Sequence, residues 1–160
     1  MLHVFYAKNS GVELSVRDGK INLRFFTFGN GENKKARFVL DPVEAFHTNL
    51  AIVSMVRGKS DKFRLIHKYN EVTSTVTVEK WQKNEKSGYA VVYKKEGENE
   101  ININVPLDQV NFLFLAELLK KASIKAVEDA EALENQKQEQ QQKKEEKTVI
   151  DDEDLQYIAE

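Results

Sequence analysis

The 160-residue chain has no cysteine, only three histidines and no long apolar run, and each absence excludes a class of protein. Without cysteine, neither a disulfide framework nor a thiolate metal site can form, which fits a reducing, cytoplasmic setting. His3, His47 and His67 lie too far apart in sequence to form a local metal motif. No stretch approaches the roughly 20 apolar residues that span a bilayer, and the N-terminus lacks signal-peptide features. We therefore expect no metal, no cofactor and no membrane insertion.

The net charge of -2 is divided unevenly along the chain. Residues 136–160 hold eight acidic residues against four lysines, whereas residues 1–105 hold 17 Lys and Arg against 12 Asp and Glu. A mildly basic body with an acidic tail indicates nucleic-acid binding, or a tail that covers the basic surface of its own chain.

The first part of the chain predicts four strands and a helix. Alternating polarity in residues 11–16 and 21–28, joined by Asp18-Gly19, predicts a hairpin, and residues 2–6 and 36–40 add two strands. The following helix, residues 41–58, has Asp41 as N-cap, Pro42 at its first position and Gly58 as its stop. Its apolar residues at helical spacing are Val43, Phe46, Leu50, Val53 and Val56.

The second part repeats this order. Residues 62–69, 74–81, 88–95 and 100–105 predict four strands, and a helix follows a cap-like Asp108. Its apolar residues are Val110, Leu113, Phe114, Leu118, Ala122 and Val127. Apolar surface beyond the needs of one sheet, including Leu119 and Ile124, suggests a homo-oligomer.

These elements predict an α+β fold with two antiparallel four-stranded sheets, each followed by a helix that covers its apolar face. The joints "LDPV" at 40–43 and "LDQV" at 107–110 are consistent with a repeated unit. We expect a domain over residues 1–135, with halves of about 1–58 and 59–135. Residues 136–160 then form a polar linker and a flexible acidic tail.

The solvent-side faces of the strands combine cations with aromatic rings, which suits single-stranded nucleic acid: exposed bases stack on the rings and cations neutralise phosphates. The candidate binding residues are Arg24, Phe26, Lys35, Arg37, Arg64, Lys68, Trp81, Tyr89 and Tyr93. The alternative is that each ring belongs to a hydrophobic core and that each cation is only a solvated charge at a strand edge. The combination favours binding.

Catalysis finds no support in the sequence. "RGKS" at 57–60 follows a helix and lacks the upstream glycine of a phosphate loop. No serine has a histidine and carboxylate constellation, and no paired carboxylates stand in a sheltered context. We expect a protein that is not an enzyme.

The tail "VIDDEDLQYIAE" combines two chemistries. Its acidic residues can mimic phosphates and compete with nucleic acid for the body, while its apolar residues can anchor in a partner's pocket. The expected partner-binding residues are Asp151, Asp152, Glu153, Asp154, Leu155, Tyr157 and Ile158. The alternative is that the acids only improve solubility.

The order of strands and helices over residues 1–134 resembles the Whirly fold, which is related to the single-stranded DNA-binding domain of the positive cofactor four type. The acidic end is similar in kind to those of bacterial and phage single-stranded DNA-binding proteins, although it lacks their final proline and phenylalanine. Arg57, Gly58 and Lys59 echo only part of a lysine-glycine-lysine-alanine motif of plant Whirly proteins.

The resemblance implies sequence-independent binding of single-stranded DNA, in an oligomer, during DNA replication, recombination or repair. Replication or recombination proteins are the expected partners of the tail, and small phage proteins share this combination of features. Two alternatives stay open: an RNA-binding chaperone or regulator, since stacking surfaces accept ribose, and a protein interaction adaptor that does not bind nucleic acid.

Overall fold

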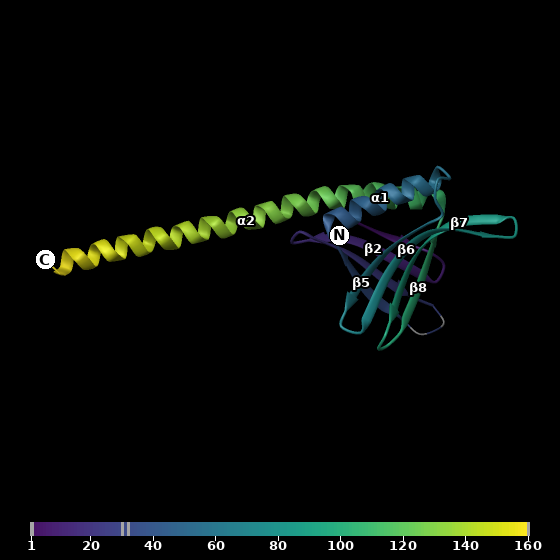
Figure 1. Cartoon of the computed structure of the whole chain (residues 1–160), viewed down its shortest axis with the longest axis horizontal. Coiled ribbons are helices and arrows are strands. Elements are labelled where there is room, and N and C mark those ends of the chain that lie inside the picture. The colour runs from purple at the N-terminus through teal and green to yellow at the C-terminus, as the bar shows by residue number, and fades with distance from the viewer. Residues whose placement is uncertain (1, 30, 32, 160) are drawn as a thin grey trace.

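The chain folds into two four-stranded antiparallel sheets with two helices at one end (Figure 1). The computed structural model describes residues 2–29, 31 and 33–159, with side chains described up to residue 144. Sheet A contains β1 (His3–Tyr6), β2 (Ser10–Arg17), β3 (Lys20–Thr27) and β4 (Lys35–Leu40) in this spatial order, and α1 (Pro42–Val56) follows. Sheet B contains β5 (Lys62–Tyr69), β6 (Val72–Lys83), β7 (Lys86–Glu96) and β8 (Ile101–Leu107), and α2 (Gln109–Ala159) follows. The predicted fold class is confirmed.

The predicted turns and caps have the expected geometry. Asp18 and Gly19 both have positive φ, 53° and 77°, so they form the tight turn between β2 and β3. At the start of α1, the Asp41 carboxylate accepts from the Glu44 N–H at 2.7 Å and the Glu44 carboxylate accepts from the Asp41 N–H at 3.0 Å. The Asp108 carboxylate caps α2 by accepting from the Asn111 N–H at 2.8 Å.

The two sheets share one core, which differs from the prediction of a separate helix-covered face for each sheet. Phe25 of β3 packs against Tyr93 of β7 with ring centroids 5.4 Å apart, and Phe38 of β4 stacks on His67 of β5 at 4.2 Å. The inner faces of the sheets therefore cover each other, and their outward faces point away from one another. This arrangement leaves one face of each sheet for other contacts.

The helices close one end of this core. On α2, Phe112 stacks on Tyr89 of sheet B at 4.6 Å, and Phe114 approaches Phe5 of sheet A at 5.9 Å. On α1, the Glu44 carboxylate lies 2.7 Å from the His67 Nε2 of β5. The helices bridge the two sheets.

The face of α1 that enters the core is not the apolar stripe that the sequence pattern suggested. The buried residues of α1 are Ala45, Thr48, Asn49, Ile52 and Met55. By contrast, Val43 is 77% exposed, Leu50 52% and Phe46 41%. Much of the apolar stripe that predicted α1 thus faces away from the core.

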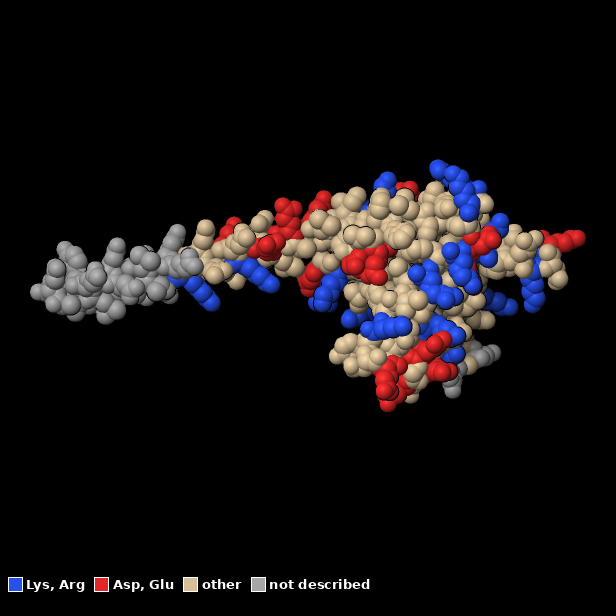
Figure 2. Space-filling view, viewed as in Figure 1, with Lys and Arg blue, Asp and Glu red and all other residues tan. Residues whose placement is uncertain are grey.

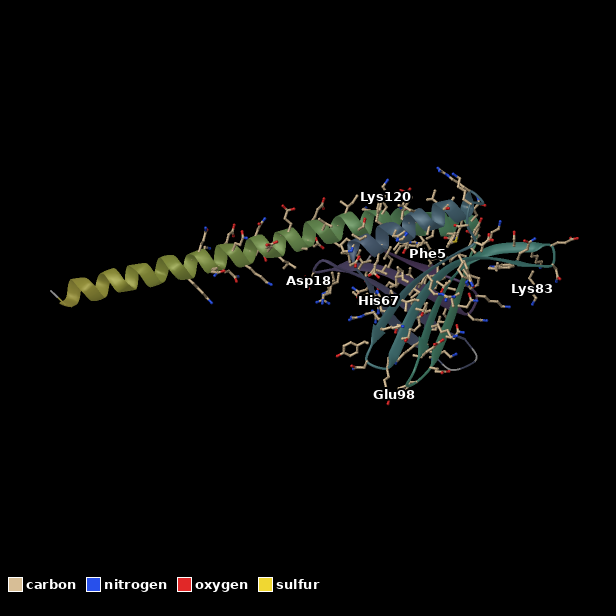
Figure 3. The ribbon with its side chains drawn as sticks, in the orientation of Figure 1. Phe5, Asp18, His67, Lys83, Glu98 and Lys120 are labelled. Carbon is tan, nitrogen blue, oxygen red and sulfur yellow. The ribbon has the colours of Figure 1, made fainter. Side chains whose placement is uncertain are left out.

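Beyond the body, α2 continues as a single helix to Ala159 (Figure 1). Residues 130–144 are exposed throughout, and their side chains spread around the helix (Figure 3). The predicted tail residues, 151–158, have side chains outside the described residues, so the expected flexibility of the tail stays a prediction. Within the described part of the chain, no helix is long and apolar enough to cross a membrane.

Candidate nucleic-acid interface

The strand register places the polar residues of sheet A in two neighbouring rows on its outward face. One row pairs Tyr6, Gly11, Phe26 and Lys35 across β1 to β4. The next row pairs Val4, Glu13, Arg24 and Arg37. Since side chains alternate along each strand, all of these residues lie on the side opposite the core. The four predicted site residues of this sheet are therefore brought together.

Three aromatic rings gather at one end of this face. Phe26 lies 6.0 Å from Tyr6 and 6.1 Å from Phe28, and Tyr6 lies 6.3 Å from Phe28, measured between ring centroids. Tyr6 is 69% exposed and Phe28 40% exposed. We call Tyr6, Phe26 and Phe28 the aromatic cluster. Rings of this kind offer planar surfaces on which unstacked bases can lie.

Gly11 allows the aromatic cluster to form. A Cβ atom at this position would lie 2.3 Å from the Cζ of Phe26. The Phe26 ring therefore lies directly over the β2 backbone, in a space that any larger residue would fill. This contact fixes the ring in place before a ligand arrives.

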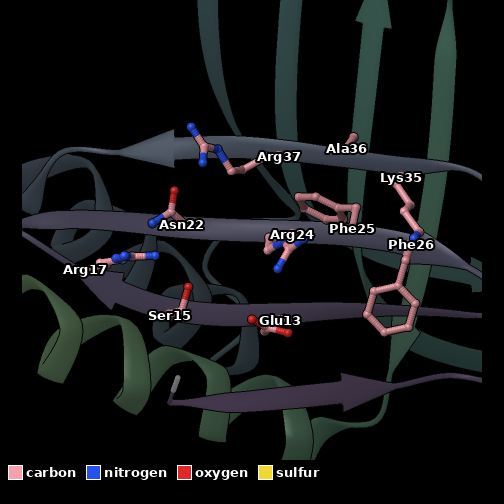
Figure 4. A pocket seen from close by; sticks show the side chains of 10 residues that line it. All are labelled: Glu13, Ser15, Arg17, Asn22, Arg24, Phe25, Phe26, Lys35, Ala36 and Arg37. Atoms are coloured by element: carbon pink, nitrogen blue, oxygen red, sulfur yellow. The ribbon is translucent and has the colours of Figure 1, made fainter.

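Cations line a groove beside the aromatic cluster (Figure 4). The groove has a volume of about 670 Å³ and is lined by Arg17, Arg24, Lys35 and Arg37, with Phe26 and Glu13 among them. Arg24 and Arg37 are direct partners on β3 and β4. Among the residues whose side chains are described, no ion pair within 4.0 Å joins Arg24, Lys35 or Arg37 to a carboxylate. We call this surface the sheet A groove.

The remaining predicted cations lie on the opposite side of the molecule. Arg64 and Lys68 are exposed on β5 and point outward from sheet B, where Arg64 pairs with Thr77 and Lys68 with Thr73. Figure 2 shows Lys and Arg side chains gathered over the strands below the two helices. The nine predicted residues therefore do not form one continuous surface on a single sheet.

Trp81 stands on a hairpin that projects beyond sheet B. The pairing of β6 with β7 extends to Lys83 and Lys86, whereas the pairing of β6 with β5 ends at Glu79 and that of β7 with β8 ends at Tyr89. Residues 80–88 thus form a two-stranded arm, visible at the right of Figure 1. The arm carries three lysines and one glutamate.

The Trp81 ring is held flat against this arm. A Cβ atom at Gly88 would lie 2.6 Å from the Cζ2 of Trp81, and the indole N–H donates to the Tyr89 carbonyl at 3.3 Å. The residue is nevertheless 36% exposed. One face of the ring is covered by backbone while the rest remains open to a ligand.

The placement of Tyr89 and Tyr93 on the solvent side was wrong. Tyr89 is 7% exposed and Tyr93 3%, and both rings enter the shared core. Tyr89 stacks on Phe112, and Tyr93 packs against Phe25 with its hydroxyl 3.4 Å from that of Ser74. The large apolar area of a tyrosine ring favours burial when the hydroxyl can reach a polar partner or solvent. Neither ring is available for a base.

The structure adds four residues that the sequence did not single out for the site: Tyr6, Glu13, Arg17 and Phe28. Phe28 lies two positions after Phe26, so alternation alone could have identified it. Tyr6 follows the buried Phe5, and the same alternation places it outside. The positions of Glu13 and Arg17 in the sheet A groove required the strand register.

Comparisons with known proteins connect the fold to solved structures. No protein-family model and no curated protein matches the sequence. Among solved structures, the plant transcriptional regulator PBF-2 aligns with a TM-score of 0.56 and 17% identity, covering 83% of this chain and 85% of that chain.

Two further structures are similar. WHY1 from Arabidopsis thaliana aligns with a TM-score of 0.54 and 16% identity, covering 76% of this chain and 87% of that chain. The MRP1/MRP2 structure from Trypanosoma aligns with a TM-score of 0.52 and 13% identity, over 75% of this chain and 80% of that chain. At these identities the likeness concerns the fold alone, and the chain has a Whirly-like fold.

Proposed function

We propose that this protein binds single-stranded DNA without enzymatic activity and with little dependence on overall sequence, in DNA replication, recombination or repair. The observation that carries the proposal is the sheet A groove, where Arg24 and Arg37 face each other and neither forms an ion pair within 4.0 Å among the described side chains. Like charges directly opposite on neighbouring strands destabilise a sheet. A polyanion bound over both arginines removes this cost.

The aromatic cluster explains why the protein should prefer single-stranded DNA to duplex DNA. Tyr6, Phe26 and Phe28 lie beside the arginines on the same outward face, so a strand can place phosphates on the cations and bases on the rings. Stacking contributes about 1–3 kcal/mol per base. In a duplex the base faces are already stacked, so a duplex gains only the phosphate contacts.

Titration of a dye-labelled oligothymidine tests this function. We expect binding that weakens as salt rises, with a slope of about -0.7 per neutralised phosphate, and weaker binding of a duplex of equal length. Trp81 is the sole tryptophan, and contact of the strand with the arm is expected to quench its fluorescence. Duplex binding equal to or tighter than single-strand binding would contradict the proposal.

Two controls distinguish the alternatives in the same titration. A matched RNA strand that competes better than DNA would favour an RNA chaperone or regulator. Failure to bind any nucleic acid, together with a stable protein complex that requires residues 148–160, would favour a protein interaction adaptor.

The acidic tail is proposed to compete with DNA for the basic surface and to recruit replication or recombination proteins. Four consecutive acids at residues 151–154 provide the competing charge, and the following apolar residues provide the anchors. Competition with DNA on the same chain requires the tail to leave the helical path at times.

Deleting residues 148–160 is expected to tighten binding of oligothymidine at low salt, because a competing anion is lost. The difference should vanish at high salt, where the tail is screened. Replacing the four acids at 151–154 by their amides provides a control that keeps the length and the apolar anchors, and it should tighten binding equally. Unchanged affinity in both variants would exclude competition and leave only recruitment.

A further inference from the structure

Glu13 places a negative charge within a groove that otherwise suits phosphate. Its neighbour across β2 and β3 is Arg24, and both residues line the sheet A groove with Arg17 and Arg37. A groove that bound only the phosphate backbone would be weakened by a carboxylate at this position. The residue is half-buried on the outward face.

Glu13 is also not engaged by the surrounding arginines. Among the described side chains, no ion pair within 4.0 Å joins it to Arg17, Arg24 or Arg37. A carboxylate can only accept hydrogen bonds. The ligand group that suits Glu13 is therefore a hydrogen-bond donor that arrives with an anionic strand.

The Phe26 ring lies next to this carboxylate. Gly11 and Glu13 are two positions apart on the same face of β2, about 7 Å along the strand, and the Phe26 ring lies over Gly11. Figure 4 shows Glu13 beside Arg24, between Ser15 and the ring of Phe26. A base stacked on Phe26 can therefore direct its edge toward Glu13.

We propose that the sheet A groove contains a base-reading subsite in which Glu13 recognises guanine. The two carboxylate oxygens accept from the N1–H and the N2–H of guanine, while Phe26 stacks on the base and Arg24 and Arg37 hold the adjacent phosphates. Recognition through the Watson–Crick edge is available in single strands because this edge is unpaired. This inference rests on the proposed single-strand binding.

The other bases fit the subsite less well. Adenine and cytosine each offer one amino group beside a ring acceptor. Thymine offers a single N3–H between two carbonyl oxygens, which repel a carboxylate. At this one position, the protein should therefore bind guanine most tightly and thymine least tightly. The other positions of the strand are bound without base preference.

Short oligothymidines of about eight nucleotides with one central substitution test the subsite. We expect the strand with one guanine to bind the full-length protein about five- to tenfold more tightly than oligothymidine, the lower part of the range for a bidentate base contact. Inosine, which lacks the N2 amino group, should lose about half of this gain on a logarithmic scale.

The variant Glu13→Gln should change the affinity for the two strands by different factors. It should bind oligothymidine more tightly, because a negative charge leaves the groove, and it should lose the preference for guanine. Glu79→Gln, on the outward face of sheet B beside Lys62, is the matched control and should retain the wild-type preference.

Equal binding of the guanine and thymine strands by the wild-type protein would overturn the subsite. So would a Glu13→Gln variant in which both strands gain affinity by the same factor, since Glu13 would then act only as a charge beside Arg24. Both outcomes leave the proposed function intact. Failure of every strand to bind would overturn the proposed function as well.

Discussion

Replacing Arg24 and Arg37 together by glutamine is expected to weaken binding of oligothymidine about a hundredfold at low salt. In the proposed complex, each arginine supplies a charged contact to a phosphate, worth about 1.5 kcal/mol, which is about tenfold in affinity. The slope of the logarithm of affinity against the logarithm of salt should also fall by about 1.4, because two phosphate contacts are lost. A titration at several salt concentrations measures both effects.

The same double variant should be about as stable as the wild-type protein. Removing both charges relieves the repulsion between Arg24 and Arg37 across β3 and β4, and this gain offsets the lost attraction between Arg24 and Glu13 across β2 and β3, each being at most about 1 kcal/mol. Urea unfolding measures the change. Loss of binding with retained stability would identify the pair as a ligand site, whereas loss of both would identify it as part of the fold.

Arg57→Gln combined with Lys59→Gln provides the matched control. This variant also removes two positive charges, from exposed positions after α1 that lie outside the sheet A groove. We expect a small, general loss of affinity from the change in net charge. An equal loss in both double variants would show that net charge, and not the groove, determines binding.

The sequence predicted four residues of the sheet A groove, Arg24, Phe26, Lys35 and Arg37, because alternation in β3 and β4 separates charged from apolar side chains. In β3, Ile21, Leu23 and Phe25 share one face while Arg24 and Phe26 share the other, and arginines are rarely buried without partners. This chemistry favoured the solvent side for Arg24 and Phe26, while which sheet face is uncovered stayed open until the structure showed it. The strand order was also predictable, because tight hairpins join neighbouring strands of an antiparallel sheet.

In β7, alternation did not indicate which face enters the core. Tyr89, Val91 and Tyr93 form one face and Ala90 and Val92 the other, so both faces are apolar and either could be buried. The choice depends on Phe25 and Phe112, which come from β3 and α2 and are distant in sequence. Packing against elements distant in sequence therefore determines which face of β7 is buried, which alternation along the strand could not show.

For the helices too, the sequence pattern did not determine which residues are buried. Apolar spacing predicted both helices, yet the faces that enter the core combine large residues such as Ile52 and Phe112 with small ones such as Ala45, Ala122 and Ala126. Small residues let two helices and two sheets approach closely at one end of the molecule. Several apolar residues of the predicted stripes, among them Val43, Phe46 and Val127, are nevertheless exposed, and their exposure requires an explanation of its own.

A groove between α1 and α2 supplies that explanation. It has a volume of about 370 Å³ and is lined mainly by Pro42, Val43, Phe46, Ile124 and Val127. The exposed fraction is 77% for Val43 and 53% for both Ile124 and Val127. Contiguous exposed apolar surface on a soluble protein marks an interaction site. We propose that a second copy of this chain covers the groove, which gives the expected homo-oligomer.

Phe46→Glu combined with Ile124→Glu is therefore expected to dissociate the oligomer into single chains. A charge transferred into an apolar contact without a partner costs several kcal/mol, which corresponds to more than about a hundredfold in the dissociation constant. Because both side chains are exposed in the single chain, the fold should persist. Sedimentation measures the mass, and circular dichroism checks the fold.

Tyr69→Glu is the matched control, since Tyr69 is 80% exposed on β5 and lies outside the groove. It should leave the oligomer intact. A wild-type protein that sediments as a single chain, or a double variant that keeps the wild-type mass, would refute the assembly through this groove.

In the proposed oligomer, each copy adds another sheet A groove to the same particle. Linked grooves raise the effective concentration of binding sites along one strand, so dissociation should also weaken binding of long oligothymidine more than binding of short oligothymidine.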